Sequence, residues 1–502
     1  MAAQKVMLVV IDGYGEGVDS PYNAVTRADT PFIDRLRREG LMTKLSCCSE
    51  SVGLPPNTMG GSEVGHFTLG AGRIVWQSLQ EINRSIDSGE FFEKAPLLEA
   101  IVNCQKNGSA LHLVGMISDQ GIHSHIDHLF ALMKLAKDKG VEKLYIHAIA
   151  DGRDVPERSV KRYLELIEEK IRELGVGEIV SLVGRYFAMD RDENIDRTKF
   201  AYDLMTQGIG DNAEDVSVAV DKQYNNGVDT DYYLKPIILN RDAVVRNEDS
   251  VVFFNYRSDR AKQLTATFTE NVYDFGVVRP FFVCFGPYSK VAPVLFQANP
   301  VVNNLGEVLS HAGKRQLRVA ETEKYPHVTF FFNSQRKDPF EGEDHILVPS
   351  PKVPSYDLKP EMSSYEIRDA VVEKLEEAGN LYDFVLINFA NADLVGHSGD
   401  FEATVRAVES IDECLADIVL LAREKGYVVM VTGDHGNAEM MKYENGEACP
   451  SHTFNDVFFV LLSEEEYRLR GGSTGLQDVA PTILEVMGVP KPIEMTGESL
   501  IE

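Results

Sequence analysis

The segment that decides the fold is YVVMVTGDHGN, residues 427–437. It begins with an apolar run, Tyr427–Thr432, in which apolar side chains do not alternate with polar ones. Such a run is typical of a strand buried on both faces of a parallel sheet. Asp434 and His435 follow it directly, after a single glycine. Because ligands of open α/β sheets bind at the carboxyl ends of the strands, we expect a functional site at this point.

Two distant segments repeat the pattern. The run Lys5–Ile11 is followed by Asp12, and the run Tyr382–Phe389 leads to Asp393 and His397. A further apolar run, Val457–Leu462, comes shortly after His452. Helical patterns accompany these strands at Ala370–Gly379, at Ala403–Gly426 and from Thr30-Pro31, where threonine can cap and proline fits the first turn. Strands alternating with helices predict an α/β domain with a mostly parallel sheet.

The middle of the chain predicts a second α/β domain by the same criteria. Its expected strands are Ala110–Ile117, Lys143–Ala150, Glu178–Val183 and Ser250–Tyr256, and its expected helices include His125–Gly140 and Glu157–Gly175. A chain of 502 residues is also too long for one core, since single cores rarely exceed about 250–300 residues.

The composition is that of a soluble globular protein, with 44% hydrophobic and 25% charged residues. The formal net charge of −28 argues against nucleic acid or an anionic membrane as a partner. The sequence contains no stretch of about 18 apolar residues, so we expect no membrane span. The first apolar run is too short for a secretion signal. The six cysteines form no CxxC pair, so we expect free thiols and a cytoplasmic location.

The side chains at the strand ends form a candidate metal centre. They are Asp12, Asp393, His397, Asp434, His435 and His452. Oxygen and imidazole ligands without thiolate suit Mn²⁺, Zn²⁺ or Mg²⁺, and the share of carboxylates favours Mn²⁺. The set is large enough for two ions, which can clamp a transferring phosphoryl group. Taken singly, each residue is more often a turn, a core histidine or a salt bridge; their recurrence at equivalent strand ends favours the metal.

A candidate nucleophile is Ser62, in the glycine-rich segment MGGSEVGH of residues 59–66. Small neighbours leave its hydroxyl accessible, and coordination to a metal is one way to activate a serine. An ordinary helix N-cap is the alternative reading of this motif taken alone.

Cationic side chains follow the strands of the middle domain. They are His123, Arg153 beside Asp154, Arg185, Arg257 and Arg260. Guanidinium groups bind carboxylate and phosphate in a planar fork, which suits a substrate bearing both. Scattered surface salt bridges, or a pair between Arg153 and Asp154, are the alternative. Since the candidate metal ligands flank these cations in sequence, we expect residues 77–304 to be inserted into a domain made of residues 1–76 and 305–502.

Several ordered blocks resemble the cofactor-independent phosphoglycerate mutases of the alkaline phosphatase superfamily, from one end of the chain to the other. The blocks begin at Ser62, Ser118, Asp151, Gly184, Phe254, Glu321, Asp393, Gly433 and His452. The resemblance implies an alkaline-phosphatase-like metal domain with an inserted α/β substrate domain. It implies an isomerase of glycolysis and gluconeogenesis that interconverts 3-phosphoglycerate and 2-phosphoglycerate. It also implies a monomer that needs no 2,3-bisphosphoglycerate.

The resemblance also implies roles for residues. Ser62 would become phosphorylated and would share one ion with Asp12, Asp434 and His435, while Asp393, His397 and His452 would hold the other. The ions would be Mn²⁺, with Mg²⁺, Zn²⁺ or Co²⁺ as alternatives. Asp154 would be a general acid or base. Substrate-binding positions would be His123, Arg153, Asp154, Arg185, Arg191, Arg257, Arg260 and Lys324, with Lys324 also offsetting charge on the phosphoryl group.

Some positions depart from the family blocks. Gly61 and Thr68 stand where asparagine is common, Gly433 where alanine is common and Ser258 where proline is common. Three other functions are weighed against the mutase: a metal phosphatase or sulfatase, a phosphometabolite sensor without turnover, and a mutase for pentose phosphates. The arginine-rich middle domain argues against the first, the intact Ser62 against the second, and the middle motifs against the third.

Overall fold

The computed structural model describes residues 4–270, 273, 275, 277–297, 300–377, 381–443 and 445–502. It divides into two compact units. Unit 1 consists of Met1–Trp76 and Pro300–Glu502, and unit 2 of Gln77–Asn299. Unit 2 is therefore an insertion in the chain of unit 1, and its second boundary lies five residues before the position expected from the sequence.

Unit 1 contains one seven-stranded sheet. Its strands, in their order across the sheet, are β11 (Glu343–Val348), β10 (Gln316–Glu321), β12 (Phe384–Phe389), β1 (Lys5–Ile11), β13 (Tyr427–Gly433), β14 (Val457–Leu462) and β2 (Leu41–Leu45). The first five are parallel, and β14 runs antiparallel to both of its neighbours. Ile11 is in register with Phe389 and with Gly433, so three strands end at the same level of the sheet.

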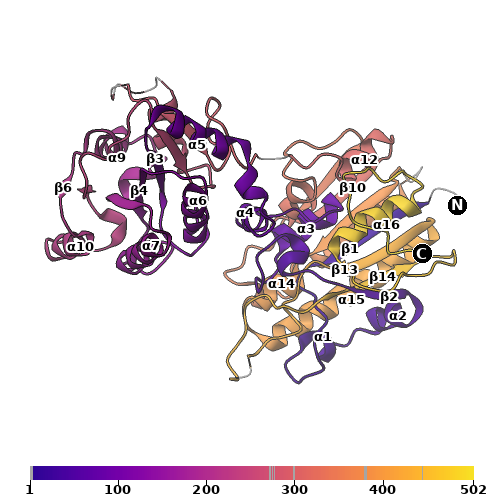
Figure 1. Ribbon diagram of the computed structural model, residues 1–502. Helices are drawn as coiled ribbons and strands as arrows, with labels where there is room; N and C mark the ends of the chain where they lie inside the picture. The colour runs from indigo at the N-terminus through magenta and orange to yellow at the C-terminus, as the bar shows by residue number, and fades with distance from the viewer. Residues whose placement is uncertain are drawn as a thin grey trace. The chain divides into compact units, whose positions relative to one another are not determined.

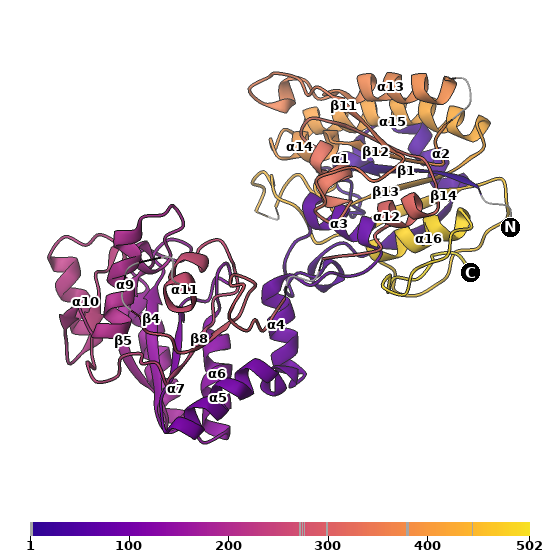
Figure 2. The ribbon, with the colours of Figure 1, turned by 90° about the horizontal axis from the view of Figure 1, so that it is seen from above.

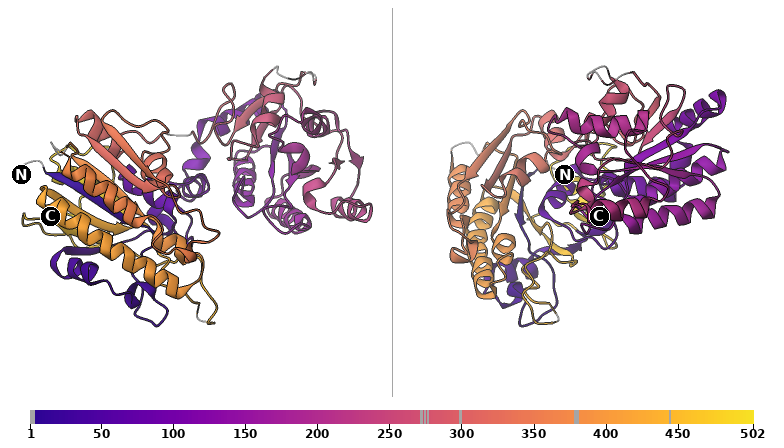
Figure 3. Two further views of the ribbon diagram at one scale, coloured as in Figure 1. Left: turned by 180° about the vertical axis from the view of Figure 1, so that it is seen from behind. Right: turned by 90° about the vertical axis from the view of Figure 1, so that its left-hand side faces the viewer.

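Helices cover both faces of this sheet (Figure 1). They are α1 (Ala24–Arg27), α2 (Pro31–Glu39), α3 (Ser62–Ala71), α12 (Leu305–His311), α13 (Ser364–Glu376), α14 (Asn391–Gly396), α15 (Phe401–Glu424) and α16 (Val479–Val486). Met7 and Val9 of β1 pack in the core shared with α2, α13 and α15, whereas Leu8 and Val10 pack in the core shared with α3, α12 and α16. The long helix α15 follows the sheet along one face (Figure 3, left). Burial on both faces explains why the strands are apolar throughout.

Unit 2 has its own seven-stranded sheet and its own core (Figure 2). Its strands, in order, are β6 (Asp211–Asn212), β7 (Ile237–Ile238), β5 (Glu178–Gly184), β4 (Leu144–Ala150), β3 (Leu111–Met116), β8 (Ser250–Phe253) and β9 (Phe281–Cys284). Only the pairing of β5 with β7 is antiparallel among these strands. Its helices are α4 (Ser78–Asp87), α5 (Ala95–Asn107), α6 (Ile126–Asp138), α7 (Val160–Leu174), α8 (Arg185–Ala188), α9 (Ile195–Gln207), α10 (Val216–Asn225) and α11 (Lys262–Thr269).

The structure confirms the expected fold class, two α/β units with mostly parallel sheets, and corrects some boundaries. Helix α13 begins at Ser364, six residues before the expected start, and its expected end at Gly379 lies outside the described residues. Strand β8 ends at Phe253, three residues before the expected Tyr256. Strands β10 and β11 were not expected.

Two expectations drawn from composition can be compared with the structure. All six cysteines are free thiols, as expected. Among the described residues, no helix is both long enough and apolar enough to cross a membrane.

Candidate active site

The topology of unit 1 places the candidate ligands side by side. Strands β10, β12, β1 and β13 are consecutive in the sheet. The segments that follow them carry Lys324, Asp393, Asp12 and Asp434, while Ser62 is the first residue of α3. The loop before β14 adds His452. Residues more than 400 positions apart in sequence therefore meet at one edge of the sheet, as the strand-end pattern predicts.

Two glycines permit the close approach of these segments. Gly13 has φ +72°, and a Cβ there would lie 2.6 Å from the Asp393 Cα. A Cβ at Gly65 would lie 2.8 Å from the backbone oxygen of Asp434. Any larger residue at these positions would push the ligand-bearing loops apart, since real Cβ atoms do not approach backbone so closely.

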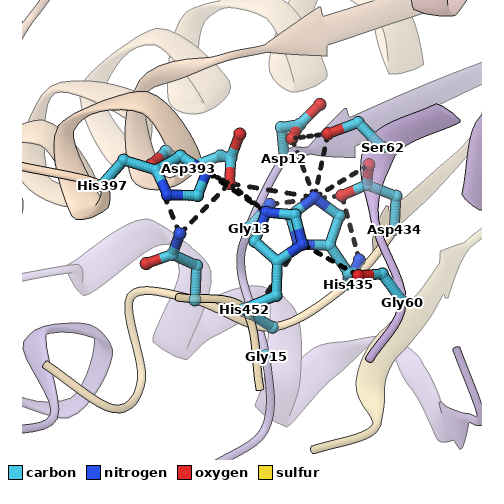
Figure 4. A network of polar contacts seen from close by, with 12 residues as sticks. Asp12, Gly13, Gly15, Gly60, Ser62, Asp393, His397, Asp434, His435 and His452 are labelled. Atoms are coloured by element: carbon cyan, nitrogen blue, oxygen red, sulfur yellow. Dashed lines mark hydrogen bonds and ion pairs between the residues drawn. The ribbon is translucent and has the colours of Figure 1, made fainter. Parts of the chain in front are cut away.

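Ser62 belongs to a buried polar cluster, in which it lies beside Asp12 (Figure 4). Its hydroxyl donates to Asp12 Oδ1 over 2.9 Å and lies 2.9 Å from His435 Nε2. The ammonium of Lys324 donates to three acceptors: Ser62 Oγ at 2.7 Å, Asp12 Oδ1 at 2.6 Å and Asp393 Oδ2 at 2.7 Å. A serine hydroxyl held this way is oriented and has an ammonium group beside its oxygen, which suits a nucleophile.

Asp393, His397 and His452 form a second group beside the first (Figure 4). The Nε2 atoms of His397 and His452 lie 3.2 and 3.3 Å from Asp393 Oδ1, and 3.2 Å from each other. Their Nδ1 atoms lie 2.6 and 2.8 Å from the carbonyl oxygens of Pro450 and Gly60. A carbonyl partner fixes the proton on Nδ1, so in the neutral rings both Nε2 lone pairs face Asp393. Two lone pairs and a carboxylate that converge in this way suit a cation.

The charges of the cluster shift the ionisation of its members. Burial alone would raise the pKa of Asp12, but Lys324 and His435 hold it well below its usual range. Burial would lower the pKa of Lys324, but Asp12 and Asp393 raise it. Burial likewise opposes a charge on His435, yet Asp434 and the other carboxylates raise its pKa to about 10. Lys324 and His435 thus offset the negative charge of the carboxylates beside them.

The structure places all seven candidate ligands in this cluster, with His435 close to both groups. Its Nε2 lies 3.3 Å from Asp12 Oδ1 and 3.8 Å from Asp393 Oδ1. Three-residue groups with ligand atoms in reach of one ion are Asp12, His66 and Asp434, and Asp393, His435 and His452. The buried Asp434 Oδ2 accepts no hydrogen bond within the described part of the chain, although His66 Nδ1 lies 3.1 Å and His435 Nε2 3.7 Å from it, so this oxygen can also coordinate a metal. The donor set fits divalent cations.

Sequence reasoning missed Glu439, a buried carboxylate that ties three ligand-bearing loops together. It accepts hydrogen bonds from the backbone of Gly15 at 3.2 Å and of Asn437 at 2.8 Å, and from the hydroxyl of Thr453. The Asn455 amide donates to it over 2.9 Å. Its only sequence signal is its place five residues after Asp434, because its partners come from distant segments.

Unit 2 gathers cationic side chains at the ends of its strands. Arg185 is buried, donates to Asp151 and Asp154 over 2.7 and 2.5 Å, and contacts His123 Nε2 at 2.9 Å. Asp154 thus pairs with Arg185. Burial, followed by the charge of Arg185, lowers the pKa of His123 to about 4, so its ring is neutral at pH 7.

The other arginines of unit 2 that we expected to bind substrate are more exposed than Arg185. Arg191 and Arg257 both pair with Asp259, at 2.8 and 2.9 Å. Arg260 donates to the Met189 carbonyl, and its pKa is lowered by burial and by its neighbours Arg191 and Arg185. Arg153 is exposed, with its backbone NH bonded to Asp151. A cavity of about 440 Å³ within unit 2 is lined in part by Arg257, Tyr256 and Gly121.

Glu321, at the end of β10, yields a prediction on stability. Burial raises its pKa from an ordinary value near 4.5 to about 7, against the opposing effect of Ser350. The native state therefore favours the protonated acid. Protonation of Glu321 therefore contributes to stability in full below pH 4.5, and this contribution is lost as the pH rises through 7.

We expect Glu321→Gln to remove this dependence. From pH 4.5 to pH 8, the free energy of unfolding of wild type should fall by about 3 kcal/mol more than that of the variant. Urea denaturation of both proteins at each pH measures this difference, from the midpoint and the slope of each curve. Glu366→Gln is the matched control, because Glu366 is a neighbouring acid that is exposed. A wild type and a Glu321→Gln variant that respond identically to pH would contradict the prediction.

Comparisons with known proteins show the family of the chain. The family model described as "BPG-independent PGAM N-terminus" matches residues 82–290. A 2,3-bisphosphoglycerate-independent phosphoglycerate mutase of Desulforudis audaxviator is 49% identical over 99% of both chains. That of Moorella thermoacetica is 46% identical over 99% of this chain and 98% of its own. The crystal structure of a Leishmania mexicana phosphoglycerate mutase at low cobalt concentration has a TM-score of 0.58, with 30% identity, over 100% of this chain and 98% of that one.

The fold, the serine-centred cluster and these likenesses define an isomerase that acts on phosphoglycerate. More narrowly, the chain belongs to the 2,3-bisphosphoglycerate-independent phosphoglycerate mutase family.

Proposed function

We propose that the enzyme interconverts 3-phosphoglycerate and 2-phosphoglycerate through a phosphoserine on Ser62, with two divalent metal ions and without 2,3-bisphosphoglycerate. One observation carries this proposal. The Ser62 hydroxyl lies within 2.9 Å of a carboxylate, an imidazole and an ammonium group, in a cluster rich in metal ligands. We place the reaction in glycolysis and gluconeogenesis, in the cytoplasm, and the enzyme as a monomer.

The donor set suits two ions, with Mn²⁺ as the preferred metal and Mg²⁺, Zn²⁺ or Co²⁺ as alternatives. Asp12, Ser62, Asp434 and His435 would hold one ion, and Asp393, His397 and His452 the other. Bound metals would withdraw charge from the phosphoryl oxygens and lower the pKa of the serine hydroxyl. The cobalt in the description of the Leishmania mexicana relative is compatible with such a site.

The protein's own groups prepare Ser62 for attack. Asp12 Oδ1 accepts a hydrogen bond from the Ser62 hydroxyl, and Lys324 Nζ donates a hydrogen bond to Ser62 Oγ. As the hydroxyl loses its proton, the ammonium offsets the charge that develops on Oγ. Ser62 also begins α3, so backbone NH groups of the first turn face the region where a phosphoryl group on Oγ would lie.

The cationic residues of unit 2 hold the glycerate. Arg257, Arg191 and Arg260 offer guanidinium groups to its carboxylate, and Arg185 and Arg153 add positive charge near its hydroxyls. Lys324, which belongs to unit 1, offsets charge on the phosphoryl group beside Ser62. His123 accepts from Arg185 at Nε2, and its buried Nδ1 has no partner among the described residues, which leaves one N–H for substrate. We assign proton transfer to Asp154: it gives a proton to the glycerate oxygen that leaves phosphorus when Ser62 attacks, and it takes a proton from the other hydroxyl when that oxygen takes the phosphoryl group back from Ser62.

This division of labour makes a prediction for Arg257→Ala. We expect isomerisation to fall by roughly 10²-fold, because a charge-assisted contact with the glycerate is lost. Hydrolysis of p-nitrophenyl phosphate should change less than about threefold, since that ester has no glycerate. The assay couples 2-phosphoglycerate formation to enolase, without added bisphosphoglycerate.

Arg241→Ala is the matched control, an exposed arginine of unit 2 that contacts Asn212. It should leave both activities unchanged. If Arg257→Ala lowers both activities equally, unit 2 does not hold the glycerate as proposed. A wild type that releases inorganic phosphate and forms no isomer would favour a phosphatase instead.

A further inference from the structure

Two fully buried polar side chains adjoin the candidate ligands and take no part in the chemistry proposed above. Asn388 lies within β12, in register with Val10 of β1, where other side chains are apolar. His66 lies on α3, one turn after Ser62. Both have an exposed fraction of 0%. Burying an amide or an imidazole is costly unless its polar atoms are paired, so their partners indicate why they are there.

The amide of Asn388 joins Asp12 to His66. Its Nδ2 atom lies 2.9 Å from Asp12 Oδ2 and 3.0 Å from His66 Nε2. Each of the two amide hydrogens thus has one acceptor. The opposite orientation of the amide would set its oxygen against a carboxylate, so the contacts themselves define the orientation.

His66 extends the chain of contacts to Ser62 and Asp434. Its Nδ1 lies 2.9 Å from the backbone oxygen of Ser62 and 3.1 Å from Asp434 Oδ2. Both neighbours are acceptors, so the proton is on Nδ1, and Nε2 is the acceptor that Asn388 needs. The two residues therefore bridge three candidate ligands of one metal ion: Asp12, Ser62 and Asp434.

These contacts fix the orientation of the Asp12 carboxylate and of the start of α3. Asn388 occupies the outer oxygen of Asp12, Oδ2, which leaves Oδ1 facing Ser62 Oγ and Lys324 Nζ. His66 fixes the backbone at the start of α3, where the Ser62 side chain begins. Residues that hydrogen-bond to metal ligands fix the orientation of those ligands, and their removal typically lowers metal affinity by about 10–100-fold.

We propose that Asn388 and His66 are positioning residues that orient Asp12, Ser62 and Asp434 for one of two metal ions. This inference rests on the proposed function. It predicts a loss of affinity at one ion and not at the other, because neither residue contacts Asp393, His397 or His452 in the described structure.

The test is calorimetric titration of Mn²⁺ into the chelator-treated, full-length protein. We expect wild type to bind two ions and Asn388→Leu, which keeps the volume and removes the amide, to bind one of them at least about tenfold more weakly. Asn333→Leu is the matched control. Asn333 is also buried in unit 1 and donates to a carboxylate, that of Glu343, over 2.8 Å, away from the candidate ligands. This variant should lower thermal stability and leave both Mn²⁺ affinities unchanged.

If Asn388→Leu does not fold, His66→Gln is titrated in its place, with the same expected loss at one ion. A folded variant with both affinities within twofold of wild type would overturn the proposal, as would an equal loss at both ions or an equal loss in Asn333→Leu. If wild type binds no Mn²⁺, the metal assignment itself is wrong. This outcome differs from the others because the titration of wild type shows it without any substitution.

Discussion

Ser62→Ala is expected to lower the rate of isomerisation by ~10⁴-fold or more, which corresponds to about 5.5 kcal/mol of transition-state stabilisation. The substitution removes the hydroxyl on which we propose that the phosphoenzyme forms. The groups around it, the acceptor Asp12 and the donor Lys324, would stay in place but have no nucleophile to orient. The enolase-coupled rate, without bisphosphoglycerate, measures the effect.

The covalent intermediate gives an independent measurement for the same variant. Wild type quenched in acid during turnover should carry a phosphoryl group on the peptide that contains Ser62, and Ser62→Ala should carry none. Ser364→Ala is the matched control, since Ser364 is another fully buried serine of unit 1, and its hydroxyl donates to the backbone oxygen of Glu361, away from the candidate ligands. A Ser62→Ala enzyme that isomerises at the wild-type rate would end the phosphoserine mechanism.

The strand-end residues could be predicted because their positions follow from topology alone. Asp12 and Asp434 come directly after runs of apolar residues, and parallel strands bring such ends to one edge. The fold class followed from the same runs, because strands covered on both faces leave an unbroken apolar signature. In each case the prediction needed only the local sequence and the direction of the chain.

Strand β10, which precedes Lys324, has no such signature. Its sequence, QLRVAE, places Arg318 in the core, where the guanidinium lies 4.9 Å from the ring centre of Phe332 and 5.0 Å from that of Phe384. Glu343 of β11 lies 3.6 Å from it. A buried charge is stabilised by partners distant in sequence, so the strand could not be predicted locally. Lys324 was accordingly suggested only by family resemblance.

Asn388 and Glu439 illustrate the same limit within the site. Each is a polar residue in an otherwise apolar or glycine-rich setting, and each acquires its role from loops that join only after folding. Gly61 departs from the family pattern, and backbone strain does not explain the glycine. Its backbone is extended, with φ −172°, a conformation that any residue can adopt. A side chain there would start 3.4 Å from the His452 ring, within ordinary contact.

Removal of divalent cations is expected to have the second largest effect, a fall in isomerisation of ~10³-fold, or about 4 kcal/mol. Chelation would leave Asp12, Asp393 and Asp434 gathered around one ammonium and one imidazolium. The phosphoryl oxygens of the substrate would then meet carboxylates with too little positive charge to offset them. We expect Mn²⁺ to restore the rate most fully, with smaller effects of Co²⁺, Mg²⁺ and Zn²⁺, because the ligands are mainly carboxylate and imidazole.

Thermal melting separates this loss from unfolding. Mn²⁺ at 100 times its dissociation constant should stabilise the native state by about 2.7 kcal/mol for each ion, and so raise the melting temperature of the chelated protein. Asp434→Asn should abolish part of that rise, because the substitution removes one carboxylate of the candidate ligand set. Asp344→Asn, at an exposed acid of unit 1 paired with Arg315, should leave the rise intact. A chelated enzyme that isomerised at full rate would show that Lys324 and His435 alone suffice for phosphoryl transfer, and the two-metal assignment would then be wrong.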